Sequence, residues 1–317
     1  FIIMDIYNVL LRLMKKKLLV IIGARGIGDL IYHLPLLRSL YKSYKEKIII
    51  LSNKVNQAGE VYKNEKFVKN IIDFDNNRYS FIKTIKKIIE FKSIINKLNV
   101  DEIILTANYR RLVIPVLLSN AKKKYIFGLG NLMINKDKSL NHLTISERLI
   151  KYTKDLRLPV KVNNFFLTKP KIKKEVKNKI FINIDSHHDQ NNWPINNYLQ
   201  IIKILMKKNI LYINFSPNKK HFLTYFPKKL LFSNKIHYTY KKKIFEIINT
   251  IETCSHVIGN ESGPICLGSS LKKNVHAIYL PIYTKPESKI IFKKNKYYNA
   301  DRLPADKIIK KIIKSIT

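Results

Sequence analysis

Short apolar runs alternate with longer amphipathic stretches along most of the chain, beginning at Leu18. The runs are rich in Ile, Leu and Val and stop at turn residues, which is typical of strands buried in a parallel sheet. The stretches between them, such as Leu30–Tyr44 and Ile82–Leu98, place their apolar residues on one face of a helix. In the first half, the predicted strands are Leu18–Ile22, Ile48–Leu51, Ile71–Phe74, Glu102–Leu105 and Tyr125–Phe127. Strands that alternate with helices predict a doubly wound α/β domain.

The alternation lapses around residues 156–178, where Pro159, Pro170 and a Lys-rich run predict an interdomain linker. A second series follows, and we expect two Rossmann-like domains that face a cleft between the carboxyl ends of their strands. The predicted elements of this series are strand Ile180–Ile184, helix Ile195–Met206, strand Ile210–Phe215, helix Lys243–Thr253, strand Val257–Ile258, helix Ser262–Leu271, strand Val275–Leu280 and a basic amphipathic helix at Pro304–Ile316. The predicted bounds are 14–160 for the N-terminal domain, 175–300 for the C-terminal domain and 301–317 for the basic helix.

Composition agrees with this organisation. At 317 residues the chain has room for about two domains. Its 46% hydrophobic residues can fill two cores, which excludes a wholly disordered chain. No run of about 20 apolar residues occurs, so no helix that spans a bilayer is predicted. The two cysteines, Cys254 and Cys266, lie in a segment patterned as buried helix and strand, which suits a reducing compartment and gives no metal-ligand spacing.

The net charge of the chain bears on which partners it can bind. Sixty Lys and Arg against 22 Asp and Glu give a formal net charge of +38. Such an excess favours nucleic acid, an anionic membrane leaflet or a phosphorylated glycan as partner, and a codon bias toward Ile, Asn and Lys explains it equally well. The lysines are spread over almost every helix, and basic–aromatic RNA-binding spacing is absent. We therefore predict no nucleic-acid partner and expect attraction to an anionic membrane surface.

The start of the sequence is apolar from Phe1 to Leu13 and is followed by Lys15-Lys16-Lys17. A secretory signal carries its positive charge before the apolar run, so this order does not predict export. The segment could lie on a membrane as a short amphipathic helix, but Met14 leading directly into a strand is more typical of a natural beginning. We expect a cytoplasmic protein that is peripheral at the inner face of the cytoplasmic membrane.

The first turn with candidate chemistry runs from Gly23 to Asp29, between a strand and a helix. Its glycines allow a ligand to approach the backbone, and the helix start attracts negative charge. The spacing is not G-x-G-x-x-G, and the second strand ends Leu51-Ser52-Asn53 without an acidic residue, which argues against a dinucleotide and an NAD(P)-dependent dehydrogenase. Asp29 is either the helix N-cap or a general base in the cleft, and local chemistry alone favours the cap.

The second turn, Val257-Ile258-Gly259-Asn260-Glu261-Ser262-Gly263-Pro264, also joins a strand to a helix. Ser262 is a good N-cap, and Pro264 suits the first helical turn, where its missing N–H costs nothing. The amides of Ser262 and Gly263 at the positive end of the helix form a seat for a diphosphate. Glu261 could hold sugar or ribose hydroxyls. A simple capped turn is the plainer alternative.

The third element is the polar loop from Asp185 to Pro194, which contains His187, His188 and the single Trp of the chain. Two His and two Asp suggest a metal, but the sequence offers no third or fourth ligand at suitable spacing. We predict no metal and expect these side chains to hydrogen-bond phosphate or sugar.

With these three elements in order, the sequence resembles glycosyltransferase family nine, the lipopolysaccharide heptosyltransferases, from Leu18 to its end. The matching pieces are Leu18–Ile22 with Gly28-Asp29 and Leu34-Pro35-Leu36-Leu37-Arg38, then Trp193-Pro194 with Tyr198, then Gly259-Asn260-Glu261-Ser262-Gly263-Pro264, which resembles the family's G-N-D-S-G-P. The resemblance implies the α/β GT-B fold with the acceptor at the first domain and the donor bound by the second. It also implies inverting transfer without a metal and without a cofactor, the nucleotide-sugar being a substrate.

Carried onto this sequence, the resemblance makes Asp29 the catalytic base and so reverses the preference for a cap. The donor-binding residues it implies are Asn260, Glu261, Ser262, Gly263, Pro264, His187 and Asn191. The residues expected at the acceptor or its phosphates are Arg25, Gly28 and His33.

Three positions depart from the family pattern. Glu261 stands where Asp is usual, Cys266 where His is usual, and Asn191 where the family has a phosphate-binding Lys two residues before the Trp. Arg25, His187 or His188 could replace that cation. The expected function is transfer of a heptose-like sugar from an ADP-heptose-like donor to a lipid-linked acceptor, the lipopolysaccharide core or a related glycan. A catalytically weakened protein that binds nucleotide or glycan and kept the fold is the alternative.

Overall fold

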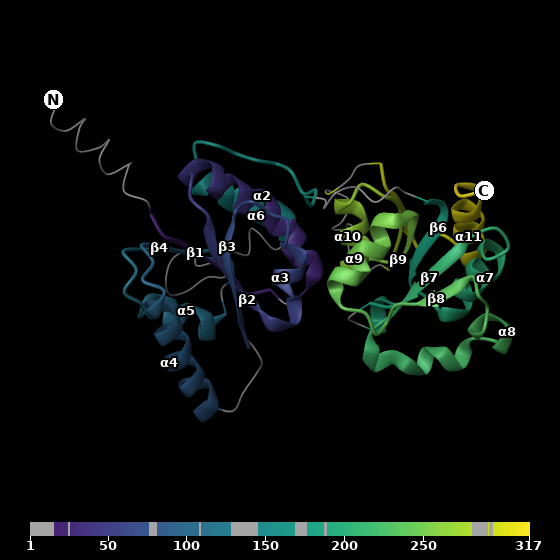
Figure 1. The fold of residues 1–317 in the computed structure, drawn as a ribbon, viewed down its shortest axis with the longest axis horizontal. Coiled ribbons are helices and arrows are strands. Elements are labelled where there is room, and N and C mark those ends of the chain that lie inside the picture. Colours follow the sequence, from purple (N-terminus) through teal and green to yellow (C-terminus); the bar gives the residue numbers. More distant parts are fainter. Residues whose placement is uncertain are drawn as a thin grey trace.

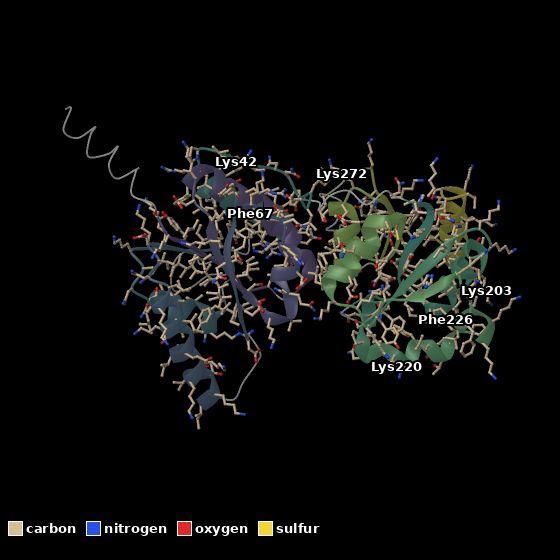
Figure 2. The ribbon with its side chains drawn as sticks, viewed as in Figure 1. Lys42, Phe67, Lys203, Lys220, Phe226 and Lys272 are labelled. Atoms are coloured by element: carbon tan, nitrogen blue, oxygen red, sulfur yellow. The ribbon has the colours of Figure 1, made fainter. Side chains whose placement is uncertain are left out.

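The fold consists of two α/β domains that lie side by side (Figure 1). Figure 2 shows how a chain with so many lysines folds into compact domains. Lysines such as Lys42 and Lys203 point outward, whereas Phe67 and Phe226 lie inside. The computed structural model describes residues 16–24, 26–75, 81–107, 109–127, 145–168, 176–186, 189–280, 291 and 294–317.

The N-terminal domain is built on a parallel five-stranded sheet of order β3-β2-β1-β4-β5. Its described elements are β1 (Leu18–Ile22), α2 (Ile27–Tyr44), β2 (Ile48–Asn53), the 3-10 helix η1 (Lys54–Asn56), α3 (Ala58–Val61), β3 (Val68–Phe74), α4 (Phe81–Lys97), β4 (Glu102–Leu105), α5 (Arg110–Leu117), β5 (Lys123–Ile126) and α6 (Ile145–Asp155). The order reverses direction between β1 and β4, so the carboxyl ends of these two strands frame the crevice where doubly wound sheets bind ligands.

The C-terminal domain repeats this plan in a parallel six-stranded sheet of order β11-β10-β9-β6-β7-β8. Its described elements are β6 (Val176–Asn183), the 3-10 helix η3 (Asp189–Asn191), α7 (Ile195–Leu205), β7 (Ile210–Asn214), the 3-10 helix η4 (Pro217–Tyr225), α8 (Lys228–Leu231), β8 (Ile236–Tyr238), α9 (Ile244–Thr253), β9 (Cys254–Asn260), α10 (Gly263–Ser270), β10 (Asn274–Tyr279), β11 (Lys296–Asn299) and α11 (Ala305–Lys314). Here the reversal lies between β6 and β9.

The predicted strands are confirmed, and β1 and β4 at the centre of the N-terminal sheet match their predicted bounds. All five residues of β1 and all four of β4 are buried, because each strand is covered on both faces. Strands that reach the surface were predicted too short: β6 starts at Val176 and β3 at Val68, since exposed lysines and asparagines continue the strand beyond its apolar run. The short elements α3, α5, α8, β8 and β11 carry too few residues for a periodic signal and were not predicted.

The beginning of the predicted linker packs on the N-terminal domain. Arg38 donates hydrogen bonds to the carbonyls of Asn164 (2.9 Å) and Phe166 (2.6 Å) and to the Glu65 carboxylate (2.8 Å). The Ser39 hydroxyl accepts a bond from the Val162 amide at 2.8 Å. Arg38, which ends the Pro-Leu-Leu-Arg segment of α2, therefore fixes the direction in which the chain leaves its first domain.

The predicted C-terminal basic helix is present as α11, but its apolar face is covered. Ile308, Ile309 and Ile312 are buried, and α11 packs against α7 of the same domain. What α11 exposes is mainly a row of lysines. No described helix is long and apolar enough to cross a bilayer.

The two domains share one continuous apolar core. The largest cluster of buried side chains contains Leu30 and Leu34 of α2 together with Ile265 and Leu267 of α10. Contacts between α2 and α10 and between α3 and α9 carry this cluster across the boundary. The first turns of α2 and α10, which follow the two strands at the sheet reversals, are thereby brought together.

Candidate functional site

The Asp29 carboxylate is held by the backbone at the start of α2. Gly26 is the N-cap residue, with φ −102° and ψ 149°, and its amide donates to Asp29 Oδ2 at 2.8 Å. Asp29 is thus the third helical residue and caps the helix from inside its first turn. The interpretation of Asp29 as the N-cap itself is corrected, because Gly26 takes that position and the carboxylate reaches back to it.

His33 lies one turn further along α2, directly beneath Asp29. Its Nδ1 is 2.6 Å from the Asp29 carbonyl and its Nε2 is 2.8 Å from the Thr106 hydroxyl, which follows β4. Burial lowers the pKa of His33 from 6.5 to about 4, so the ring is neutral; Nδ1 donates to the carbonyl and Nε2 accepts from Thr106. Its side chain is 2% exposed, so it ties β4 to the turn that carries Asp29 instead of presenting itself to an acceptor.

The two turns touch at two glycines. A Cβ placed on Gly28 would come within 3.1 Å of Cys266 Sγ, and one placed on Gly263 within 3.1 Å of Ile27 Cβ. The Tyr32 hydroxyl is 3.1 Å from the same sulfur. Glycine at positions 28 and 263 therefore favours the close approach of α2 and α10, and Cys266 lies in this contact as a small buried side chain.

At the turn before α10, Ser262 and Pro264 take the positions that the sequence predicts, but the Ser262 side chain makes no capping hydrogen bond. Ser262 is the N-cap, with extended backbone, and Pro264 occupies the first helical turn. The Ser262 hydroxyl donates to the Asn260 carbonyl at 2.7 Å and accepts from Asn183 Nδ2 at 3.1 Å. The Glu261 amide donates to Ile278 O at 2.9 Å, which continues the pairing of β9 with β10 into the turn. The α10 start is therefore fixed from both neighbouring strands.

Asn260 supports the site from below. Its side chain is fully buried, and Oδ1 accepts both the Trp193 amide and the Tyr198 hydroxyl at 2.9 Å. Trp193, Tyr198 and Asn260 are thus joined through one amide oxygen, which fixes the start of α7 to the end of β9. The Asn260 side chain is therefore engaged within the protein and not turned toward a donor, and its carbonyl accepts the Ser262 hydroxyl.

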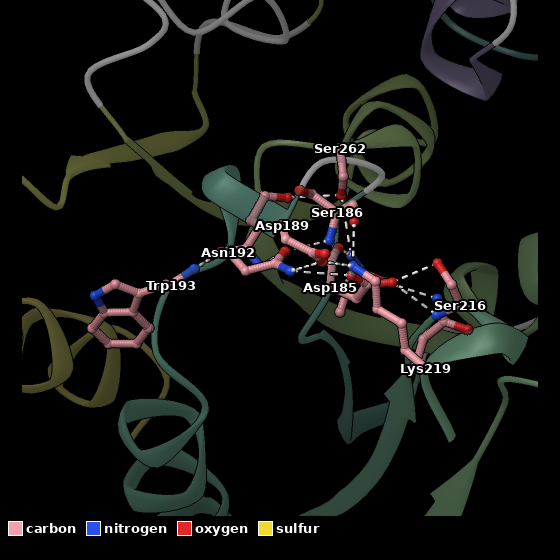
Figure 3. A network of polar contacts seen from close by, with 11 residues as sticks. Asp185, Ser186, Asp189, Asn192, Trp193, Ser216, Lys219 and Ser262 are labelled. Carbon is pink, nitrogen blue, oxygen red and sulfur yellow. Dashed lines mark hydrogen bonds and ion pairs between the residues drawn. The ribbon is translucent and has the colours of Figure 1, made fainter. Parts of the chain in front are cut away.

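A buried ion cluster lies beside this turn (Figure 3). The Lys219 ammonium is 2.5 Å from Asp185 Oδ1 and 2.5 Å from Asp189 Oδ1, and it donates to the Ser186 carbonyl at 3.0 Å. Asp185 also accepts the Ser216 amide at 3.0 Å and the Ser216 hydroxyl at 2.5 Å. The cluster joins the loops after β6 and β7 at the carboxyl edge of the sheet.

Lys219 was missed by sequence reasoning. Burial works to lower the pKa of Lys219, but its hydrogen bonds to Asp185 and Asp189 raise the pKa above its usual value, so it stays charged. The same bonds lower the pKa of Asp189, whose side chain is 86% exposed. The signal that could have found Lys219 is its place just after β7; in a chain with this many lysines, that place alone does not single it out.

A cavity of about 510 Å³ opens on this cluster. Its lining combines Lys219 and Asp189 with the aromatic side chains of Trp193, Phe222 and Tyr225. This volume lies within the range of about 300–1,000 Å³ that is usual for ligand pockets. Charge at one end and aromatic rings elsewhere suit a nucleotide.

A second cavity, of about 690 Å³, lies in the N-terminal domain between α4 and α5. Its lining includes Phe74 and Phe91 as apolar residues and Arg110 as a cation. Tyr109, also in the lining, is 3.6 Å from where a Cβ on Gly23 would be, so the cavity adjoins the turn that carries Asp29.

Some predicted site residues cannot be placed. Arg25, His187 and His188 lie outside the described residues, and Asn191 is described as part of η3 but not in its side chain. The four remaining donor residues, Glu261 to Pro264, are brought together with Gly28 and Asp29 by the α2–α10 contact. In the part of the chain that the structure describes, no three His, Cys, Asp or Glu side chains gather as metal ligands.

No family model matches the sequence, and no curated protein matches it. Solved structures are similar: a glycosyl transferase family 9 protein from Veillonella parvula DSM 2008 gives a TM-score of 0.74 at 15% identity, over 95% of this chain and 90% of that chain. The ADP-heptose LPS heptosyltransferase II of E. coli gives a TM-score of 0.72 at 14% identity, over 95% of this chain and 98% of that chain. Heptosyltransferase WaaC of E. coli with ADP gives 0.70 at 13% identity, over 95% and 100%.

These likenesses establish the GT-B fold and confirm the predicted fold class. At such low identity they establish the fold alone, and one fold supports many reactions. The function has to be argued from the site.

Proposed function

We propose that the protein is an inverting, metal-independent glycosyltransferase that uses a nucleotide-diphosphate sugar. The observation that carries the proposal is the contact between two strand-to-helix turns of different chemistry. One turn presents the Asp29 carboxylate, and the other presents the amino end of α10. Gly28 and Gly263 let them approach until a methyl group on either would lie 3.1 Å from a side chain of the other domain.

In the proposed reaction an acceptor hydroxyl attacks the anomeric carbon from the face opposite the nucleotide. A new carbon–oxygen bond forms as the bond to the diphosphate oxygen breaks, and the hydroxyl proton passes to the Asp29 carboxylate. General-base assistance of this kind contributes about 10²–10⁴ in rate. The departing diphosphate gains negative charge, which the amides of Ser262 and Gly263 at the helix start would stabilise.

The nucleotide would occupy the cavity beside Lys219. Asn191 leaves the position of the expected phosphate-binding lysine without a cation, and Lys219 brings an ammonium group into the same loop from η4. The cluster adjoins the α10 start through Asn183, whose Nδ2 donates to the Asp185 carbonyl and, at 3.1 Å, to the Ser262 hydroxyl. We assign Lys219 as the cation that meets the diphosphate after exchanging its contact with the exposed Asp189.

The acceptor would enter from the N-terminal domain. The 690 Å³ cavity adjoins the Asp29 turn and combines apolar walls with the arginines Arg110 and Arg111. Such a lining suits a lipid-linked or core-oligosaccharide acceptor that carries phosphate, and lipopolysaccharide core or a related glycan remains the proposed class. The donor is proposed to be ADP-heptose-like, and the place of action the inner face of the cytoplasmic membrane.

A specific observation also favours a second candidate, a protein that binds nucleotide or glycan with weakened transfer. Lys219 is paired with two carboxylates, Asp185 and Asp189, so the cluster carries a net negative charge before any ligand arrives. A diphosphate must overcome this charge, which would weaken binding of the leaving group.

The two candidates separate in one experiment. A panel of ADP-, GDP- and UDP-sugars is titrated into the full chain by calorimetry, and every sugar that binds is then tested for transfer to lipopolysaccharide core by mass spectrometry. Binding with turnover supports the transferase. Binding without turnover supports the second candidate, and absence of binding to the whole panel rejects both.

A further inference from the structure

The helix α4 leaves part of its apolar face exposed. Ile82, Ile85 and Ile89 are 69%, 44% and 62% exposed. Their spacing of three and four residues places them on one side of the helix. Phe91 and Ile95, on a different face, are buried in the N-terminal core, so α4 has one face for its own domain and another that no described residue covers.

The exposed isoleucines are bordered by basic residues. Five lysines and one acidic residue lie within α4, and Lys83 and Lys86 are exposed beside the isoleucine face. The acidic residue, Glu90, is paired with Lys87 at 2.7 Å. Aliphatic side chains flanked by long cationic ones are the pattern of a helix that lies in the surface of an anionic membrane.

The position of the helix agrees with this surface. Figure 1 shows α4 projecting from the body of the N-terminal domain, with its first turns farthest out. The neighbouring helix α5 also exposes apolar side chains, Ile114 at 39%, Leu117 at 42% and Leu118 at 55%. The lysines that border the face would repel the same face of a second copy and attract an anionic surface, which favours lipid over a second copy of the chain.

We propose that the isoleucine face of α4, comprising Ile82, Ile85 and Ile89 with Lys83 and Lys86, docks the protein onto an anionic lipid bilayer. The 690 Å³ cavity lies between α4 and α5 on the side of α4 that carries Thr84, Ile88 and Phe91, which is turned away from the isoleucine face. The reason for meeting a membrane rests on the proposed function, but the docking itself is measurable without it. The basic helix α11 takes no part, because its isoleucines are already buried.

The test is flotation of the full chain with vesicles of phosphatidylcholine alone or of phosphatidylcholine mixed with phosphatidylglycerol. The protein is expected to float with the mixed vesicles and to be released as salt is raised. The apolar variant is Ile82→Ser/Ile85→Ser/Ile89→Ser. Its matched control replaces exposed apolar residues elsewhere, as Val55→Ser/Val160→Ser/Phe232→Ser.

The apolar variant should lose roughly tenfold in vesicle affinity for each isoleucine, because insertion of an aliphatic side chain is worth about 1.5–3 kcal/mol when complete. The control should float like the unmodified protein. For charge, Lys83→Gln/Lys86→Gln should cost about fivefold for each lysine, whereas Lys307→Gln/Lys310→Gln on α11 should cost much less.

Three outcomes would overturn the proposal: no flotation of the unmodified protein, equal loss in the α4 and control variants, or a dimer in sedimentation that the apolar variant converts to monomer. The last outcome would assign the face to a second copy. Nucleotide binding is measured on the same samples, so failure of docking and failure of the proposed function are distinguished. All variants keep residues 1–13, so any contribution of that segment is common to them.

Discussion

The N-terminal turn at the domain boundary and the ion cluster beside the C-terminal turn stabilise their polar groups in different ways. In the N-terminal turn the backbone amide of Gly26 holds the Asp29 carboxylate, and neutral His33 holds the Asp29 carbonyl. In the ion cluster charged side chains hold one another, with Lys219 between two carboxylates. The first arrangement positions one reactive group, whereas the second stores paired charges that a ligand can rearrange.

The largest effect is expected at the N-terminal turn. Asp29→Asn keeps an oxygen that can accept the Gly26 amide, so the turn should survive, but it removes the base. Turnover should fall by about 10²–10⁴ while nucleotide affinity stays the same. Steady-state assays and calorimetry on one preparation check both values. Glu261→Gln at the other turn is the matched control and should change donor affinity more than turnover; unchanged turnover in Asp29→Asn would dismiss Asp29 as the base.

The next effect concerns the contribution of the ion cluster to stability. Lys219→Met leaves the buried Asp185 carboxylate without its cation, which should lower the free energy of unfolding by about 3–5 kcal/mol. Lys87→Met removes an exposed ion pair with Glu90 in α4 and should cost at most about 1 kcal/mol. Urea unfolding measures both. If the two variants lose equal stability, Lys219 and Asp185 do not form the buried ion pair described. The contrast between the N-terminal turn and the ion cluster then does not hold.

The third effect should appear alike in both domains. Burial lowers the pKa of His33 to about 4 and the pKa of His276 to about 3, where nearby His256 adds to the effect. Below pH 6.5, the ordinary pKa of histidine, the unfolded chain binds a proton at each of these residues and the folded chain does not. The free energy of unfolding therefore falls as the pH drops toward 4. Each histidine should contribute about 2 kcal/mol of loss between roughly pH 7 and pH 5.

Urea unfolding at both pH values tests this for His33→Gln and His276→Gln. Each variant should show a smaller difference between the two pH values than the unmodified protein. An unchanged difference in either variant would mean that its histidine titrates normally in the folded state.

The smallest effect is expected at Asp189. Its carboxylate is exposed and competes with a diphosphate for Lys219, so Asp189→Asn should tighten nucleotide binding by no more than about fivefold. Calorimetry with the best nucleotide of the panel measures this change, with Asp301→Asn, a distant exposed residue, as control. Weaker binding in Asp189→Asn would instead make Asp189 a ligand of the nucleotide, for example through ribose hydroxyls.

The sequence predicted the parts of the molecule that depend on local pattern. Buried strands such as β1 and β4 are recognisable as apolar runs, and Ser262 and Pro264 mark the turn before α10. The resemblance to a known family then gave the fold, which the similarity to solved structures confirms.

Features that depend on approach in space were not predictable. Lys219 becomes distinctive only when β6 and β7 pair and bring it to Asp185, 34 residues away. Asn260 looks like a ligand residue in sequence, and only the folded chain turns its side chain toward Trp193. The helices α4 and α11 share an Ile–Lys pattern, and packing alone decides that one is covered and the other is not.

Cys266 gives the domain boundary a chemical reporter. Its sulfur is 3% exposed and lies against Gly28 and the Tyr32 hydroxyl, both from the opposite domain. A thiol reagent can therefore reach it only when α2 and α10 separate, and its alkylation rate would record how often the boundary opens. Cys254, buried within one domain, provides the internal reference for global unfolding. A nucleotide that closes the boundary should slow the first reaction and leave the second unchanged.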